Sequence, residues 1–168
     1  MATLKRYVAD VADFPRPGIL FRDIAPLLKE HFAETVAALD GLLREDEWRS
    51  VDAVAGIESR GFILGAALAA RRGKGFVLVR KQGKLPPPVV KLGYALEYGS
   101  GVLEMQPGDG RALLVDDVHA TGGTLRAAAE LCERAGYAVA GCATLIDLKL
   151  GEAFAWRGRP LRYVIDYG

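Results

Sequence analysis

The sequence predicts an α/β fold in which a doubly wound, mainly parallel sheet is covered by helices on both faces. Apolar segments that end in a turn of small or charged residues are followed by runs with helical spacing, and this order occurs twice. Most of these segments have no hairpin turn between them, which favours crossover connections and parallel strands. The length of 168 residues and the hydrophobic content of 51% fit one compact domain.

In the N-terminal part, the sequence predicts a short helix, a break and a second helical region. Apolar residues recur at helical spacing from position 4 to 11, so we expect a short helix that ends at the proline- and glycine-containing stretch 14–18. Residues 19–23 have the character of a brief extended piece. Helical spacing returns over residues 27–43, with a possible break near His31.

The middle of the chain alternates strands with helices, as a parallel sheet with crossovers requires. Continuous apolar runs are typical of strands buried on both faces, and longer runs with helical spacing follow two of them. The predicted strands are 51–57, 75–80, 111–115 and 137–146, and the predicted helices are 62–72 and 124–135.

One segment, residues 82–110, does not follow this alternation. It is rich in proline and glycine and too long for a structureless connection, so we expect a functional flap. Residues 94–98 and 102–105 can pair there as a small hairpin across residues 99–101.

Charge and cysteine content exclude several classes of protein. Lys and Arg number 22 against 21 Asp and Glu, so no global field attracts nucleic acid or an anionic membrane. No apolar stretch reaches a membrane-spanning length, and the N-terminus lacks the apolar core of a signal peptide. Cys132 and Cys142 form no metal-binding pair, which favours reduced core thiols in a cytoplasmic protein.

The turn after the predicted strand 111–115 has the chemistry of a phosphate and sugar site. Gly122 and Gly123 add no bulk, so the amides and hydroxyls of residues 120–124 can surround a phosphate at a helix start. Asp116 and Asp117 can accept hydrogen bonds from sugar hydroxyls. The alternative is that the acidic pair caps a helix and the glycines only form a tight turn.

A second turn and a basic run favour a further anion site. In the turn 56–61, Arg60 can make forked hydrogen bonds to phosphate oxygens, and Ser59 can donate from a helix start. Residues 71–91 carry seven basic residues and no acidic one; the alternative is a solvated face or a weak nucleic-acid patch. The chain has neither a P-loop nor a dinucleotide fingerprint. His31 and His119 lack zinc-type partners, so we expect surface or packing histidines.

Residues 116–125 resemble the signature of type I phosphoribosyltransferases, which bind 5-phosphoribosyl 1-pyrophosphate (PRPP) with magnesium. Four further blocks, 14–24, 58–62, 80–86 and 96–99, are similar to motifs of the adenine phosphoribosyltransferase family, in its order. The resemblance runs from about residue 14 to 148. It implies the type I fold as a single domain, 1–168, with a small hood at about 1–35 and a mobile flap at about 82–110.

The resemblance also implies a role for each motif. The 5-phosphate would be held by Ala120, Thr121, Gly122, Gly123 and Thr124, and the ribose hydroxyls by Asp116 and Asp117. Pyrophosphate would meet the loop of Glu58, Ser59 and Arg60, with Arg80, Lys81 and Lys84 approaching it. The main chain of Leu20 and Arg22 would read the adenine edge, while Phe21 and Leu148 would sandwich the ring. In the flap, Tyr98 is a substrate-binding position.

Glu97 resembles the family's proposed acid/base residue at the purine; the alternative is an exposed flap carboxylate. The implied reaction joins adenine and PRPP to give AMP and pyrophosphate, in purine salvage. Magnesium is expected to be held mainly through PRPP and pyrophosphate, with no ligand set in the protein. A homodimer is expected, with the segment ending at Gln82 reaching a partner's site.

Two other functions stay open at this point. The first is a phosphoribosyltransferase for a 6-oxopurine, namely hypoxanthine, guanine or xanthine, and the second is a regulator that binds PRPP without catalysis. The chain also departs from the family's pattern. The flap's far arm, before Arg111, is a few residues short, and His119 stands where an aliphatic residue is commoner. His119 can therefore contact the sugar or pyrophosphate, or face solvent.

Overall fold

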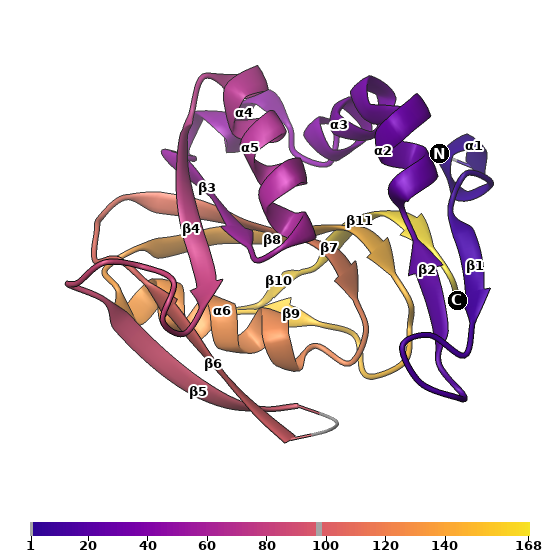
Figure 1. The fold of residues 1–168 in the computed structure, drawn as a ribbon. Helices are drawn as coiled ribbons and strands as arrows, with labels where there is room; N and C mark the ends of the chain where they lie inside the picture. Colours follow the sequence, from indigo (N-terminus) through magenta and orange to yellow (C-terminus); the bar gives the residue numbers. More distant parts are fainter. Residues whose placement is uncertain (1, 97–98) are drawn as a thin grey trace.

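A computed structural model describes residues 2–96 and 99–168, and its centre is a seven-stranded sheet (Figure 1). The strands are β3 (Ala53–Ile57), β4 (Gly75–Lys81), β5 (Val90–Leu96), β6 (Gly99–Met105), β7 (Arg111–His119), β8 (Ala138–Asp147) and β11 (Arg162–Asp166). Their order is β11-β8-β7-β3-β4-β6-β5. The first five run parallel, and β6 and β5 are antiparallel. The predicted doubly wound α/β fold is confirmed.

Helices cover both faces of this sheet (Figure 1). Helices α3 (Phe32–Asp40) and α5 (Arg60–Arg72) lie on one face, and α6 (Gly123–Arg134) lies on the other. The side chains of β7 alternate between the two resulting cores: Leu113 packs in the core under α5 and Leu114 in the core over α6. A strand covered on both sides needs apolar residues at successive positions, which explains the continuous apolar run that identified it.

The N-terminal prediction is partly wrong. Helix α1 (Ala2–Lys5) ends early, and β1 (Ala9–Ala12) pairs antiparallel with β2 (Leu20–Asp23), placing Val11 opposite Phe21. Cross-strand pairing is favoured over the helix here, because the β-branched Val11 suits a strand better than a helix. The extended piece 19–23 is confirmed as β2. The break at His31 is also confirmed, between α2 (Ala25–Glu30) and α3.

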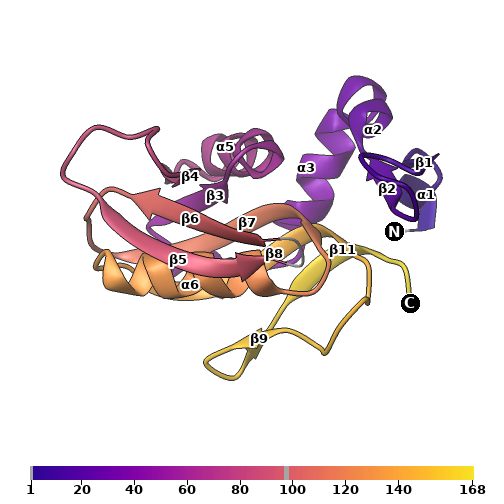
Figure 2. The same ribbon diagram turned by 60° about the horizontal axis from the view of Figure 1, so that its bottom comes forward.

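The hairpin in segment 82–110 is confirmed, but its register differs from the prediction. Leu96 pairs with Gly99 and Tyr94 with Gly101, so residues 99–101 belong to β6 and not to the turn. A Cβ at Gly101 would lie 2.9 Å from the Tyr94 ring, so this glycine admits the ring across the strand pair. The hairpin lies along α6 (Figure 2) and joins the sheet by pairing β6 with β4.

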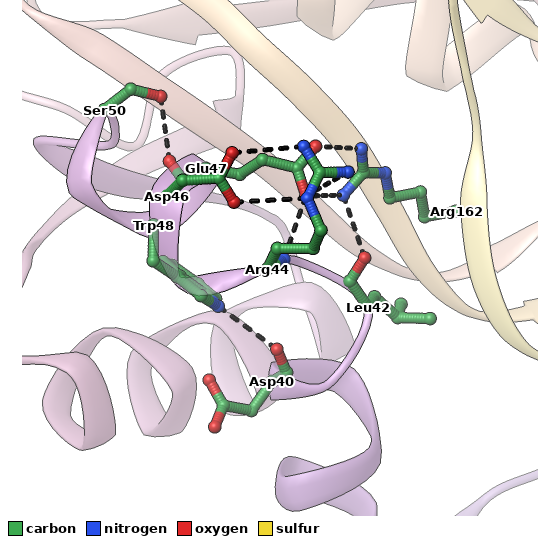
Figure 3. Close-up of polar contacts among 8 residues, drawn as sticks. All are labelled: Asp40, Leu42, Arg44, Asp46, Glu47, Trp48, Ser50 and Arg162. Carbon is green, nitrogen blue, oxygen red and sulfur yellow. Dashed lines mark hydrogen bonds and ion pairs between the residues drawn. The ribbon is translucent and has the colours of Figure 1, made fainter.

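Four further elements were not predicted: α4 (Glu45–Arg49), β9 (Ala155–Trp156), β10 (Arg159–Pro160) and β11. Arg162 of β11 donates to the carboxylate of Glu47 in α4 and to the carbonyl oxygen of Leu42, the latter at 2.8 Å (Figure 3). This cluster ties the edge of the sheet to the helices above it. Cys132 and Cys142 are free and buried. Along residues 2–96 and 99–168, every helix is too short or too polar to cross a membrane.

Candidate active site

The carboxyl end of β7 and the start of α6 enclose a small hollow, which we call the loop hollow, of about 110 Å³. Asp116 and Asp117 are 9% and 7% exposed, inside β7. Gly122 precedes α6, and no side chain caps this helix, so the alternative in which the acidic pair caps it is wrong. The loop hollow is lined by Asp116, Val118, His119, Ala120, Thr121, Gly122, Gly123, Thr124 and Leu125.

Gly122 is required by the shape of this turn. Its φ of +91° lies in the left-handed region, and a Cβ there would lie 3.1 Å from Nε2 of His119 and 3.3 Å from the Phe154 ring. The turn therefore passes close over two side chains and then enters a helix of 12 residues. Amides at a helix start and the helix dipole together favour an anion in the loop hollow.

The turn between β3 and α5 faces the same region. Nε of Arg60 lies 2.7 Å from Oδ2 of Asp117, so the two turns singled out separately in the sequence meet. The peptide bond between Glu58 and Ser59 is cis. A second hollow of about 360 Å³, the central hollow, is lined by Ile57, Glu58, Ser59, Arg60, Lys81, Tyr94, Leu103, Asp116, Asp117 and Thr124.

Glu58 holds the basic residues of β4. Its Oε2 accepts from Nε of Arg80 at 3.2 Å and from the backbone N–H of Lys81 at 3.0 Å. Burial opposes the ionisation of Glu58, but these two donors outweigh it and hold the pKa of the carboxyl below its usual range. Lys81 lines the central hollow, whereas Arg80 and Lys84 line neither the central hollow nor the loop hollow.

A third and larger hollow of about 590 Å³ lies beside β2 of the β1–β2 hairpin, and we call it the hairpin hollow. All four predicted base-binding residues line it. Its lining is Gly18, Ile19, Leu20, Phe21, Arg22, Arg60, Val118, Ala120, Leu148, Leu150 and Tyr167. Tyr167 and Leu150 were missed by the sequence analysis. Nothing local marks Tyr167, because its place depends on β11 pairing with β8. The guanidinium of Arg22 lies 4.1 Å from the centre of its ring.

Two polar atoms near the β7–α6 turn are buried without a hydrogen-bond partner, among the residues the structure describes: Oδ2 of Asp117 and Nε2 of His119. Oδ2 of Asp117 has the Arg60 ion pair but no well-directed hydrogen bond. Asp117 lines the central hollow, so a bound ligand can supply the missing hydrogen bond to its Oδ2. Burial and then the charge of Asp117 raise the pKa of Asp116. His119 does not face solvent; it is 3% exposed.

Glu97 and Tyr98, predicted as the acid/base residue and a substrate-binding residue, lie outside the described residues. In the described parts of the chain, no group of three or more His, Cys, Asp or Glu side chains could hold a metal ion. The carboxylates of Asp116 and Asp117 line the central hollow as oxygen donors.

Comparison with known proteins decides the family. Residues 27–163 match the model of the phosphoribosyl transferase domain. The adenine phosphoribosyltransferase of Hydrogenovibrio crunogenus is 49% identical over 165 residues, which cover 98% of this chain and 96% of that protein. The chain belongs to the adenine phosphoribosyltransferase family. The adenine phosphoribosyltransferase of Bdellovibrio bacteriovorus is 48% identical, with 98% of this chain and 99% of that protein covered.

Solved adenine phosphoribosyltransferases have the same fold. The crystal structure from Rhodothermus marinus has a TM-score of 0.84 at 43% identity and covers 98% of this chain and 97% of that one. The Saccharomyces cerevisiae adenine phosphoribosyltransferase has a TM-score of 0.85 at 34% identity, with 97% of each chain covered. That protein is complexed with D-2,5-dideoxy-2,5-imino-altritol 1,6-bisphosphate and adenine.

Proposed function

We propose that the chain transfers the 5-phosphoribosyl group of PRPP to adenine, giving AMP and pyrophosphate. The observation that carries this proposal is the continuity of the three hollows. Asp116 and Thr124 line both the loop hollow and the central hollow, and Arg60 lines both the central hollow and the hairpin hollow. The three hollows therefore adjoin. The loop hollow suits the 5-phosphate, the central hollow suits the ribose with its pyrophosphate, and the partly apolar hairpin hollow suits a purine.

Each hollow has a part in the proposed reaction. The amides of residues 120–124 bind the 5-phosphate, and Asp116 and Asp117 accept hydrogen bonds from the ribose hydroxyls. The bond between ribose C1 and the pyrophosphate oxygen breaks, a purine nitrogen bonds to C1, and that nitrogen loses its proton. Arg60 and Lys81 stabilise the charge that develops on the departing pyrophosphate. Glu97 is the proposed acceptor of the proton.

Magnesium fits this arrangement. Mg²⁺ in phosphate-handling enzymes is usually held by one or two carboxylates together with substrate phosphates and waters. Asp116 and Asp117 provide two carboxylates beside the central hollow, so we propose that PRPP and pyrophosphate carry the ion and these residues face it. When bound, the ion supplies charge neutralisation for the leaving group.

Adenine is the base we propose, with the main chain of Leu20 and Arg22 reading its edge. The Arg22 side chain pairs with Asp10 and stacks on Tyr167, so it leaves recognition of the base to the backbone. These contacts support the proposed role of the main chain. Phe21 and Leu148 supply apolar contacts for the ring from the lining of the hairpin hollow. The adenine in the yeast relative supports the same choice.

We also propose that residues 1–35 act as a hood over the base and residues 82–110 as a flap that closes over PRPP and excludes water. The proposed working form is a cytoplasmic homodimer. Light scattering of the purified protein tests the dimer.

The test of the function is an incubation of the purified protein with magnesium, PRPP and one nucleobase at a time. AMP and pyrophosphate should form from adenine. Nucleotide formed from hypoxanthine, guanine or xanthine in preference to adenine would instead indicate a 6-oxopurine enzyme. PRPP binding without turnover of any base would indicate a regulator.

A further inference from the structure

Tyr167 lies at the junction between the central sheet and the N-terminal hairpin β1–β2. It follows β11 directly, and its backbone N–H donates to the carbonyl oxygen of Asp147, the last residue of β8, at 3.0 Å. Its half-buried ring packs against the apolar core under α5 and lines the hairpin hollow. The central sheet therefore holds Tyr167 in place at the wall of that hollow.

The ring of Tyr167 is contacted by two cations from the N-terminal part of the chain. The guanidinium of Arg22, in β2, lies 4.1 Å from the ring centre, and Nζ of Lys5, in α1, lies 4.2 Å from it. Lys5 also donates to the carbonyl oxygen of Asp166 at 2.6 Å. A cation within about 6 Å of an aromatic ring centre is attracted to the face of the ring. One ring on the sheet therefore attaches both α1 and β2.

The hairpin β1–β2 depends on side chains for its place beside the sheet. Among residues 2–96 and 99–168, β1 and β2 pair only with each other, so no strand pairing holds this hairpin to the central sheet. Arg22 pairs with Asp10 inside the hairpin and stacks on Tyr167 outside it. The stack of Arg22 on Tyr167 is therefore one of the contacts that fix where β2 lies.

Tyr167 joins the two walls between which the base is proposed to lie. On one side it is bonded to Asp147, the residue before Leu148, and on the other it carries Arg22, the residue after Phe21. Phe21 and Leu148 are the side chains proposed to sandwich the purine, and both line the hairpin hollow with Tyr167. The contacts of this ring therefore help to set the separation of the two walls.

We propose that Tyr167 is a positioning residue for the purine: its ring, anchored on β8, holds β2 at the separation from Leu148 that the base requires. The inference rests on the proposed function, which puts the base in the hairpin hollow. Backbone groups that read a base have to lie within about 0.5 Å of their productive positions, so a loose wall weakens binding of the base. Neither Tyr167 nor any residue of β2 lines the loop hollow or the central hollow, so PRPP binding should not depend on this ring.

Steady-state kinetics of two variants at Tyr167 test the proposal. Tyr167→Leu removes the ring, so the KM for adenine should rise about tenfold, while kcat at saturating adenine and the KM for PRPP stay unchanged. Tyr167→Phe keeps the ring and both cation contacts, so its KM for adenine should stay within about twofold of the wild type. Damage to the whole fold would change kcat and both KM values together, which separates a positioning role from a purely structural one.

Arg22→Leu breaks the same link from the other side and keeps the main chain that reads the base. It should also raise the KM for adenine, and it carries the test if Tyr167→Leu does not fold. In the double variant the KM for adenine should be no higher than in Tyr167→Leu alone, because the two substitutions remove one shared contact. Independent effects that multiply in the double variant would show that the ring does not act through Arg22, and they would overturn the inference.

Tyr163→Leu is the matched control. Tyr163 also lies in β11, and Nζ of Lys149 lies 4.1 Å from its ring centre, but Tyr163 lines neither the hairpin hollow nor the loop and central hollows. Its replacement should leave the KM for adenine unchanged.

Two outcomes separate the inference from the proposed function. An unchanged KM for adenine in a folded Tyr167→Leu or Arg22→Leu protein, with the melting temperature measured alongside, overturns the inference and leaves the proposed function intact. A wild-type protein that forms no AMP from adenine and PRPP overturns the proposed function, and the inference with it.

Discussion

Arg60 and Asp117 form an ion pair across the candidate active site, with Nε of Arg60 2.7 Å from Oδ2 of Asp117. One residue comes from the start of α5 and the other from the end of β7, and the two meet because β3 and β7 are parallel neighbours. In the proposed reaction, each has a separate partner: pyrophosphate for Arg60 and a ribose hydroxyl for Asp117. Substrate binding would therefore exchange one ion pair for two charge-assisted contacts.

Replacing Asp117 with Asn tests this exchange. The amide keeps the size of the side chain but removes the charge, so kcat/KM for PRPP should fall about tenfold to a hundredfold. The melting temperature should change little, because Arg60 is a third exposed and water can solvate it. Steady-state kinetics and thermal unfolding measure both. Unchanged kinetics in a protein of unchanged stability would show that Asp117 does not contact the ribose.

Replacing Gly122 with Ala should remove both activity and part of the stability. The positive φ and the close approach to His119 and Phe154 should together cost about 1–3 kcal/mol in the free energy of unfolding. Gly73→Ala is the matched control, because Gly73 also has a positive φ, +61°, but nothing lies within 4 Å of its Cβ position. The control should lose some stability and keep its KM for PRPP, as denaturant unfolding and kinetics would report.

The link between Glu104 and the base of the flap predicts a kinetic defect. Oε1 of Glu104, which is 1% exposed, accepts from the backbone N–H of Lys84 at 2.7 Å and of Leu85 at 2.8 Å. Glu104→Ala removes both bonds, so the KM for PRPP should rise about tenfold, and protease should cut the segment 82–90 faster. Glu104→Gln retains an acceptor oxygen and should fall between Glu104→Ala and the wild type. An unaltered KM in Glu104→Ala would show that PRPP binding does not depend on the bond by which Glu104 holds the backbone of Lys84.

The cluster at the opposite edge of the sheet predicts a pH-dependent stability. The guanidinium of Arg162, followed by the backbone N–H of Arg44, lowers the pKa of Glu47 to about 2 from its ordinary 4.5 (Figure 3). A lowered pKa in the folded state stabilises the protein above pH 4.5, and this contribution is lost as the pH falls toward 2. Because the cluster is partly exposed, we expect about 1–2 kcal/mol.

Glu47→Gln should lower the free energy of unfolding by this amount at pH 7 and by much less near pH 2.5, with kcat unaffected. Urea unfolding at the two pH values measures the difference. Asp46→Asn is the control, because Asp46 pairs with the exposed Arg44 instead of Arg162. An equal loss of stability at both pH values in Glu47→Gln would contradict the assignment.

The sequence predicts those structural features that are determined by residues close together in the chain. The turn of Gly122 and Gly123 after a buried strand has a local chemical logic, and the structure places it at a helix start as expected. The four base-binding predictions came from family resemblance and share one hollow. The helix expected to reach Val11 ends at Lys5, because Val11 lies in β1, which pairs with β2.

Features that depend on distant partners were missed. Tyr167 reaches the hairpin hollow only because β11 lies beside β8, and nothing in residues 149–168 indicates that pairing. For His119, surface exposure and packing were both expected as possible, and the structure buries the side chain. Its burial follows from Asp147, Phe154 and the close Gly122, which come from β8, from the segment after β8 and from the turn before α6.

Leu113 and Leu114 of β7 point into different apolar cores, on opposite faces of the sheet. The strand that carries the candidate active-site carboxylates is therefore also central to the stability of the fold. The strand that carries Asp116 and Asp117 also contributes to the two apolar cores, so we expect an opening that releases either core to displace these two carboxylates. Amide protons in the middle of β7 should therefore exchange with solvent as slowly as any in the molecule. On heating, enzymatic activity and the folded structure should be lost in the same cooperative transition.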